Sequence, residues 1–128
     1  MQWELKDNDT RHPHGLPEHI DRRLRFALSR FGDRIERVVA FLKDHNGPKG
    51  GIDKVCRILV KVRGCGITIA AVIDSEWIAA VDRATTRIGH TVSRELDRAR
   101  RRHGASSRGR PAGRAGGPQR TRAPAPGS

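Results

Sequence analysis

The sequence has few aromatic residues, few cysteines and no long apolar run. Its 128 residues include no tyrosine, two tryptophans and three phenylalanines. No expected strand carries the pair of aromatic residues on which sheet-based RNA-binding domains stack bases, and Phe41 is an isolated candidate. Without a long apolar run or a signal-peptide pattern, we expect neither a membrane span nor secretion.

The two cysteines, Cys56 and Cys65, do not have the spacing of a metal-ligand pair. We expect both to be free thiols, with Cys56 packed in an apolar strand and Cys65 exposed at a glycine-rich turn. The six histidines also lack metal-ligand spacing. No nucleophile and base set, paired carboxylates or phosphate-binding glycine fingerprint is present. The sequence therefore predicts no catalytic residue, metal, cofactor or small-molecule substrate.

Positive charge is what the sequence has in excess. Lysine and arginine outnumber aspartate and glutamate by 26 to 14, which gives a formal net charge of +12. From residue 104 onward the chain consists almost entirely of Gly, Ala, Pro, Ser and Arg, without a large apolar side chain, so we expect residues 104–128 to be a disordered tail. The excess of cations extends over the remaining residues, 1–103, and indicates nucleic acid or an anionic membrane surface as the partner. The alternative is a soluble cationic protein without such a partner.

The longest element expected is a helix over residues 75–103, which Asp74 or Ser75 would cap. Its apolar residues recur at steps of three and four, which predicts one buried stripe: Trp77, Val81, Ala84, Ile88, Val92, Leu96 and Ala99. A second stripe of basic residues follows the same steps on a neighbouring face: Arg83, Arg87, His90, Arg94, Arg98 and Arg101. This stripe is either a polyanion-binding surface or an ordinary solvated face.

The other elements predict a two-layer α+β fold. A short strand over residues 2–5 precedes a basic helix that contains Pro17 in its first turn and that we expect Gly32 to cap. Strands are expected at 35–43, 55–63 and 67–73, with a loop at 46–51 and a tight turn at Gly64–Gly66. The order β-α-β-β-β-α predicts a four-stranded sheet, with a parallel crossover between the first two strands and both helices on one face.

One block of the sequence resembles the ribosome hibernation-promoting factors, also called ribosome-associated inhibitors, of the short single-domain type. This block runs from Arg30-Phe31-Gly32-Asp33-Arg34-Ile35 through Leu42-Lys43-Asp44 to Asn46-Gly47-Pro48-Lys49-Gly50-Gly51 and Asp53-Lys54. Supporting pieces are Glu18-His19-Ile20 and Ala79-Ala80-Val81-Asp82, and the similarity covers about residues 1–104.

The resemblance implies a protein of the cytoplasm that binds the small ribosomal subunit and its rRNA in the channel for messenger and transfer RNA. It would inhibit translation in stationary phase or stress by occlusion, without chemistry. Longer relatives carry a second, dimerising domain that has no counterpart here, so we expect a monomer off the ribosome.

Carried onto this sequence, the resemblance implies RNA contacts from both helices. The family has a basic residue where this chain has His90, which follows Gly89, a poor helix former. Lys49 either contacts RNA or belongs to a plain hairpin loop, and the tail arginines either contact RNA weakly or keep the protein soluble. The full set of expected RNA-binding residues is Arg22, Arg23, Arg30, Lys49, Arg83, Arg87, His90, Arg94, Arg98 and Arg101.

A general RNA- or DNA-binding protein is the alternative hypothesis, with the shape of a double-stranded-RNA-binding domain or as a nucleoid protein. Sedimentation of a stationary-phase lysate separates the possibilities, because a nucleoid protein travels with DNA and a broad RNA binder spreads across the gradient.

Overall fold

The computed structural model describes residues 1–7, 11–44 and 53–108, with side chains as far as Arg102. Residues 1–95 form one compact unit, and a second unit begins at Leu96. Lys49 and residues 109–128 lie outside the described residues, and so do the predictions made for them. The predicted division at residues 103 and 104 stays a prediction.

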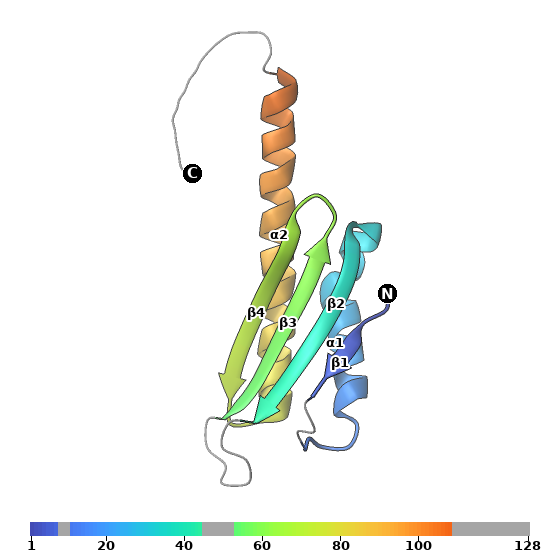
Figure 1. The fold of residues 1–128 in the computed structure, drawn as a ribbon, viewed down its shortest axis with the longest axis vertical. Helices are drawn as coiled ribbons and strands as arrows, with labels where there is room; N and C mark the ends of the chain where they lie inside the picture. Colours follow the sequence, from blue (N-terminus) through green and yellow to red (C-terminus); the bar gives the residue numbers. More distant parts are fainter. Residues whose placement is uncertain (8–10, 45–52, 109–128) are drawn as a thin grey trace. The chain divides into compact units, whose positions relative to one another are not determined.

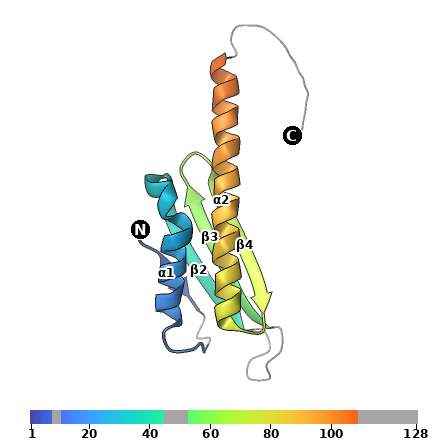
Figure 2. The same ribbon diagram turned by 180° about the vertical axis from the view of Figure 1, so that it is seen from behind.

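The first unit contains a four-stranded sheet in the order β1-β2-β3-β4. Its strands are β1 (Glu4–Lys6), β2 (Ile35–Asp44), β3 (Lys54–Val62) and β4 (Gly66–Asp74). β1 pairs with β2 in parallel, and β2, β3 and β4 form an antiparallel meander, as predicted. Figures 1 and 2 show both helices on the same face of this sheet. The predicted two-layer α+β fold is confirmed.

Helix α1 (Leu16–Leu28) begins after Gly15 and has a proline in its first turn, as predicted. It ends four residues before Gly32, so the prediction that Gly32 caps it was wrong. The chain continues as a 3-10 segment, η1 (Ser29–Arg34), within which Gly32 has non-helical dihedral angles. Hydrogen bonds hold this segment to the end of β3, because the Arg34 side chain donates to the carbonyl oxygen of Arg63 at 2.9 Å, and Arg63 donates to that of Asp33 at 2.7 Å. These contacts favour the tighter geometry over another helical turn.

Helix α2 (Trp77–Arg108) begins two residues later than predicted and continues five residues beyond the predicted end at His103. The side chain of Asp74 accepts a hydrogen bond from the backbone N–H of Glu76 at 3.2 Å, just before the first turn of α2. The predicted apolar stripe is buried at all positions except Leu96, which is half-buried. Trp77 is 6% exposed and is therefore a core residue.

The core lies between the sheet and the two helices. One stripe of α1 meets alternate residues of each strand, because successive strand side chains point to opposite faces. The fully buried large residues are Leu16, Ile20, Leu24, Leu28, Val38, Leu42, Ile58, Val60, Val62, Val81, Ile88 and Val92.

The opposite face of the sheet is open on its β4 side. Ile67, Ile69 and Ile73 are 62%, 50% and 48% exposed. In the middle of this face Arg57 lies over the ring of Phe41, 4.8 Å from its centroid. At one end of the sheet Lys54 donates a hydrogen bond to Asp44 at 2.8 Å, and this bond raises the pKa of Lys54 above its ordinary value.

The buried stripe of α1 gives a stability prediction. Leu24 is fully buried, whereas Phe26, two residues along the same helix, is 79% exposed. We expect Leu24→Ala to lower the free energy of unfolding by about 2–5 kcal/mol, because it removes packed methyl groups and leaves a cavity. Phe26→Leu should change it by less than about 0.5 kcal/mol. Urea unfolding monitored by circular dichroism measures both, and equal losses would contradict the orientation of α1.

The two cysteines differ in accessibility. Burial raises the pKa of the Cys56 thiol to about 12, whereas Cys65 is half-buried at the turn between β3 and β4. The thiolate is the reactive form, so Cys56 should resist alkylation at about pH 8 in the native protein. Mass spectrometry after iodoacetamide treatment should find one adduct on the native chain and two on the denatured chain. Cys65→Ser should leave the native chain unmodified, and an adduct on Cys56 would show that the core opens.

Candidate nucleic-acid interface

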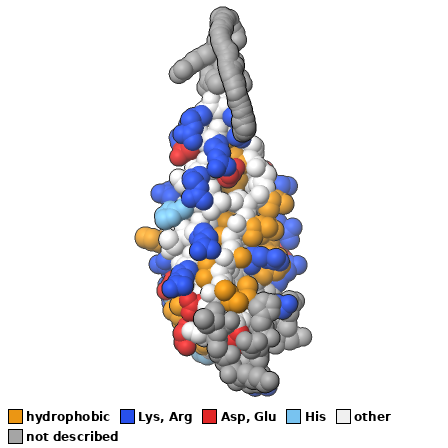
Figure 3. All heavy atoms as spheres, turned by 90° about the vertical axis from the view of Figure 1, so that its left-hand side faces the viewer, with side chains coloured by type: hydrophobic (Ala, Val, Ile, Leu, Met, Phe, Trp, Pro, Cys, Tyr) orange, Lys and Arg blue, Asp and Glu red, His pale blue; other side chains and the backbone are white. Residues whose placement is uncertain are grey.

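The outward face of α2 in the first unit carries the predicted basic row. Arg83, Arg87, His90 and Arg94 are all exposed, because steps of three and four residues return to the same side of a helix. Their side chains line a shallow groove together with Asp82, Thr86 and Thr91. Figure 3 shows lysine and arginine side chains distributed along this side of the molecule, with acidic side chains among them.

Helix α1 adds Arg23 beside this row, and η1, which follows it, adds Arg30. Both side chains line a second hollow between the helices that also includes His90 of α2. The helices meet at Gly89, where an added Cβ would lie 3.3 Å from the carbonyl oxygen of Ala27. The residue that sequence reasoning took as a weak point of the helix is therefore where α2 approaches α1 closely.

We name this set the two-helix surface and define it as Arg23 and Phe26 of α1 and Arg30 of η1, directly after α1, with Arg83, Thr86, Arg87, His90, Thr91 and Arg94 of α2.

Some predicted site residues lie elsewhere. Arg22 lines a different hollow, beside Trp3 and Leu5, toward β1. The structure therefore does not bring Arg22 together with the basic row of α2. Arg98 and Arg101 are exposed residues of the second unit.

Asp82 is an acid that lines the groove beside the basic row and connects the helices. Its Oδ1 lies 2.7 Å from Nε2 of His19 and 3.3 Å from Nε of Arg23. Arg23 also donates a hydrogen bond to the hydroxyl of Thr86 at 3.2 Å. Sequence reasoning assigned Asp82 only to the helix dipole, because the two partners lie 63 and 59 positions away and no local pattern connects them.

Two arginines of the basic row are engaged with the edge of the sheet. Arg87 donates a hydrogen bond to the carbonyl oxygen of Ala71 at 2.9 Å, and Nη1 of Arg83 lies 3.2 Å from Oδ2 of Asp74. These contacts cover part of the free edge of β4, where unpaired backbone groups would otherwise be open to another strand. Arg83 and Arg87 therefore have a structural role as well as a charge.

Among the basic residues of the two-helix surface, Arg30, His90 and Arg94 make neither an ion pair nor a side-chain hydrogen bond to the backbone within the described part of the chain. Arg30 lies over the ring of Phe31, 4.8 Å from its centroid, and Arg94 donates a weak hydrogen bond of 3.4 Å to Thr91. Since these contacts leave most guanidinium N–H donors open, these side chains are the most available to an anionic ligand.

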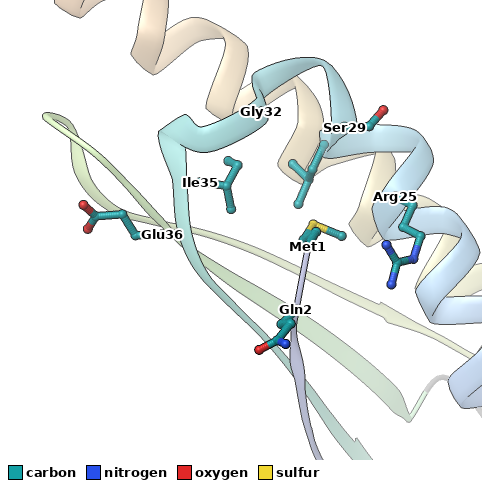
Figure 4. Close-up of a pocket in the computed structure, with 8 residues that line it drawn as sticks. Met1, Gln2, Arg25, Ser29, Gly32, Ile35 and Glu36 are labelled. Carbon is teal, nitrogen blue, oxygen red and sulfur yellow. The ribbon is translucent and has the colours of Figure 1, made fainter.

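A further hollow of about 460 Å³ lies beneath η1, beside β1 and the start of β2. Figure 4 shows the Met1 and Ile35 side chains below η1, with the Glu36 carboxylate pointing away. Its one arginine, Arg25, is paired with Asp21 at 3.0 Å, and this bond holds the pKa of Asp21 below its ordinary value. This hollow is therefore lined largely by apolar groups, and its lining residues do not include an acid and base pair that points into it.

Within the described residues, no three or more histidine, cysteine or acidic side chains gather as they would around a metal ion. None of the described helices is long and apolar enough to span a bilayer.

The fold and the two-helix surface together define a small α+β domain with a basic helical layer. The sequence matches no known family model and no curated protein. Among solved structures, the chain is similar to the N-terminal domain of Protein Y from Thermus thermophilus, with 22% identity and a TM-score of 0.59 over 73% of this chain and 98% of that domain. It is also similar to a ribosomal subunit interface protein from Coxiella burnetii, with 15% identity and a TM-score of 0.62 over 76% of this chain and 99% of that one. These similarities confirm the fold that the resemblance implied.

The position of Asp82 gives a prediction for the electrostatics of the two-helix surface. Asp82→Asn removes the only acid that lines its grooves among the described residues and releases Arg23. We expect the variant to leave heparin at higher salt than the wild type, because more cations can neutralise the polyanion. Its free energy of unfolding should fall by about 1 kcal/mol or less, since these pairs are partly exposed.

The control is Glu36→Gln, which makes the same charge change on β2. If both variants shift the elution equally, net charge alone governs binding and the local assignment is wrong.

Proposed function

We propose that this chain binds the ribosome and holds it inactive by occupying the channel for messenger and transfer RNA on the small subunit. The observation that carries the proposal is the two-helix surface, placed on a fold shared with a ribosomal subunit interface protein. The partner would be the small ribosomal subunit through its rRNA. The protein would be cytoplasmic and ribosome-associated, and it would act in stationary phase or stress.

The chemistry of the surface supports RNA as the ligand. Arginine presents a planar set of donors that matches phosphate and that also stacks on bases. Cations spread over two helices suit a folded RNA with phosphates on several strands. Each phosphate that is neutralised releases counterions, so binding should weaken steeply as salt rises.

The mechanism is steric occlusion, without a chemical step. The helices are fixed on a packed sheet, so the surface does not need to be ordered on binding, and less entropy is lost. A rigid domain that fills the channel excludes messenger and transfer RNA from the same space. Translation would be blocked through occupancy, and release of the domain would restore it.

Charge reversal tests the assignment of the surface. Arg87 is a poor choice because it also holds the β4 edge, so we choose Arg30→Glu in η1, directly after α1, with Arg94→Glu in α2. We expect the affinity for purified small subunits at about 0.15 M salt to fall tenfold or more, and the log-log salt slope to decrease by roughly two.

The matched control is Arg57→Glu with Lys61→Glu, which makes the same charge change on the open sheet face. It should bind nearly as tightly as the wild type. Sucrose-gradient co-sedimentation measures both variants, and an in vitro translation assay reports inhibition. Unreduced binding of the helix variant would refute the assignment, and a wild-type chain that spread over free RNA and DNA would favour the general nucleic-acid binder.

A further inference from the structure

Phe26 is an aromatic residue that does not contribute to the buried core. It is 79% exposed, the highest value among the large apolar residues of the described part of the chain. Leu24 and Leu28, which flank it on α1, are 0% and 1% exposed and face the core. Phe26 therefore projects from the side of α1 that faces away from the sheet.

The hollow beside Phe26 is a small site between the two helices. It has a volume of about 250 Å³ and lies where α1 and α2 cross. Part of the wall of this hollow is the backbone of Gly89, which has no side chain. At this glycine α2 lies close to α1. The residues around it include Arg23, Phe26, Arg30, Thr86, Gly89 and His90.

The groups around the hollow suit a flat, electron-rich ligand with an attached anion. Arg23 lies 5.8 Å from the centroid of the Phe26 ring, so an aromatic face and a guanidinium plane are adjacent. Arg30 and His90 lie on the rim without ion-pair partners among the described residues, and Asp82, the acid of the neighbouring groove, is engaged by His19 and Arg23. Nucleobases stack on aromatic rings and on arginine, and their phosphates pair with the cations beside them.

We propose that Phe26 is a stacking platform for one unpaired RNA base, held in the hollow between α1 and α2 with its phosphate on Arg30 and His90. The proposal rests on the proposed function and adds to it a contact that depends on a base. An apolar side chain of a protein partner would use the ring but would leave the surrounding cations without an anion, so the observations favour RNA.

The test compares variants that differ only at the aromatic ring. Phe26→Leu keeps an apolar side chain and removes the aromatic face, and Phe26→Tyr keeps the face. Phe41→Leu is the matched control, because Phe41 also lies under an arginine, Arg57, but on the open sheet face. Binding to purified small ribosomal subunits is measured over a salt series, and base accessibility is read by dimethyl sulfate probing of the rRNA.

We expect Phe26→Leu to bind roughly tenfold more weakly, because one stacking contact is lost. Its salt slope should equal that of the wild type, since no charge changes. Phe26→Tyr should restore the affinity and Phe41→Leu should retain it. One rRNA base should change reactivity on binding of the wild type and revert with Phe26→Leu.

Two results would overturn the stacking site while leaving ribosome binding intact. One is wild-type affinity for Phe26→Leu while the Arg30 and Arg94 charge reversal abolishes binding. The other is weaker binding without any base that changes reactivity, which would mean that Phe26 contacts a ribosomal protein. If the wild-type chain does not bind small subunits at all, the proposed function itself fails.

Discussion

The close contact between α1 and α2 is the constraint on which the candidate interface depends. Both helices bury an apolar stripe on the same face of the sheet, and Gly89 lets them approach until its backbone meets that of Ala27. A Cβ at this point would lie 3.3 Å from the Ala27 carbonyl oxygen, so Ala27 would have to move by a few tenths of an ångström. The cations of two segments about sixty residues apart in the sequence thereby form one continuous surface. Asp82 strengthens the same contact from the polar side through His19 and Arg23.

The basic row of α2 is not uniform, because the helix also closes the edge of the sheet. Arg83 and Arg87 make contacts with Asp74 and with the Ala71 carbonyl group, whereas His90 and Arg94, further along the helix, are exposed. An exposed edge strand can pair with other chains, and charged side chains lying over it discourage this. The same row therefore protects the fold at one end and presents open donors at the other.

Much of the fold could be predicted because periodicity is a local property. Steps of three and four residues placed the buried stripe of α2, and alternation placed Val38, Ala40 and Leu42 on the core face of β2. The end of α1 was missed because η1 is held by Arg34 and Arg63, a contact between distant segments. For the same reason the sequence did not separate Arg22 from Arg23, although consecutive residues on a helix point about 100° apart.

Phe26 and Gly89 show why a site needs the tertiary structure before it can be recognised. In the sequence, one is an apolar residue within an amphipathic helix and the other is a residue that disfavours helix. Only the crossing of α1 and α2 shows that the ring faces outward beside a hollow and that the glycine keeps the helices close enough to form it. Phosphate contacts hold a protein on RNA but carry little information on register. A domain that blocks a channel by occupancy needs a fixed register, and a single aromatic contact among cations would supply it at small cost, because the ring lies on a rigid helix.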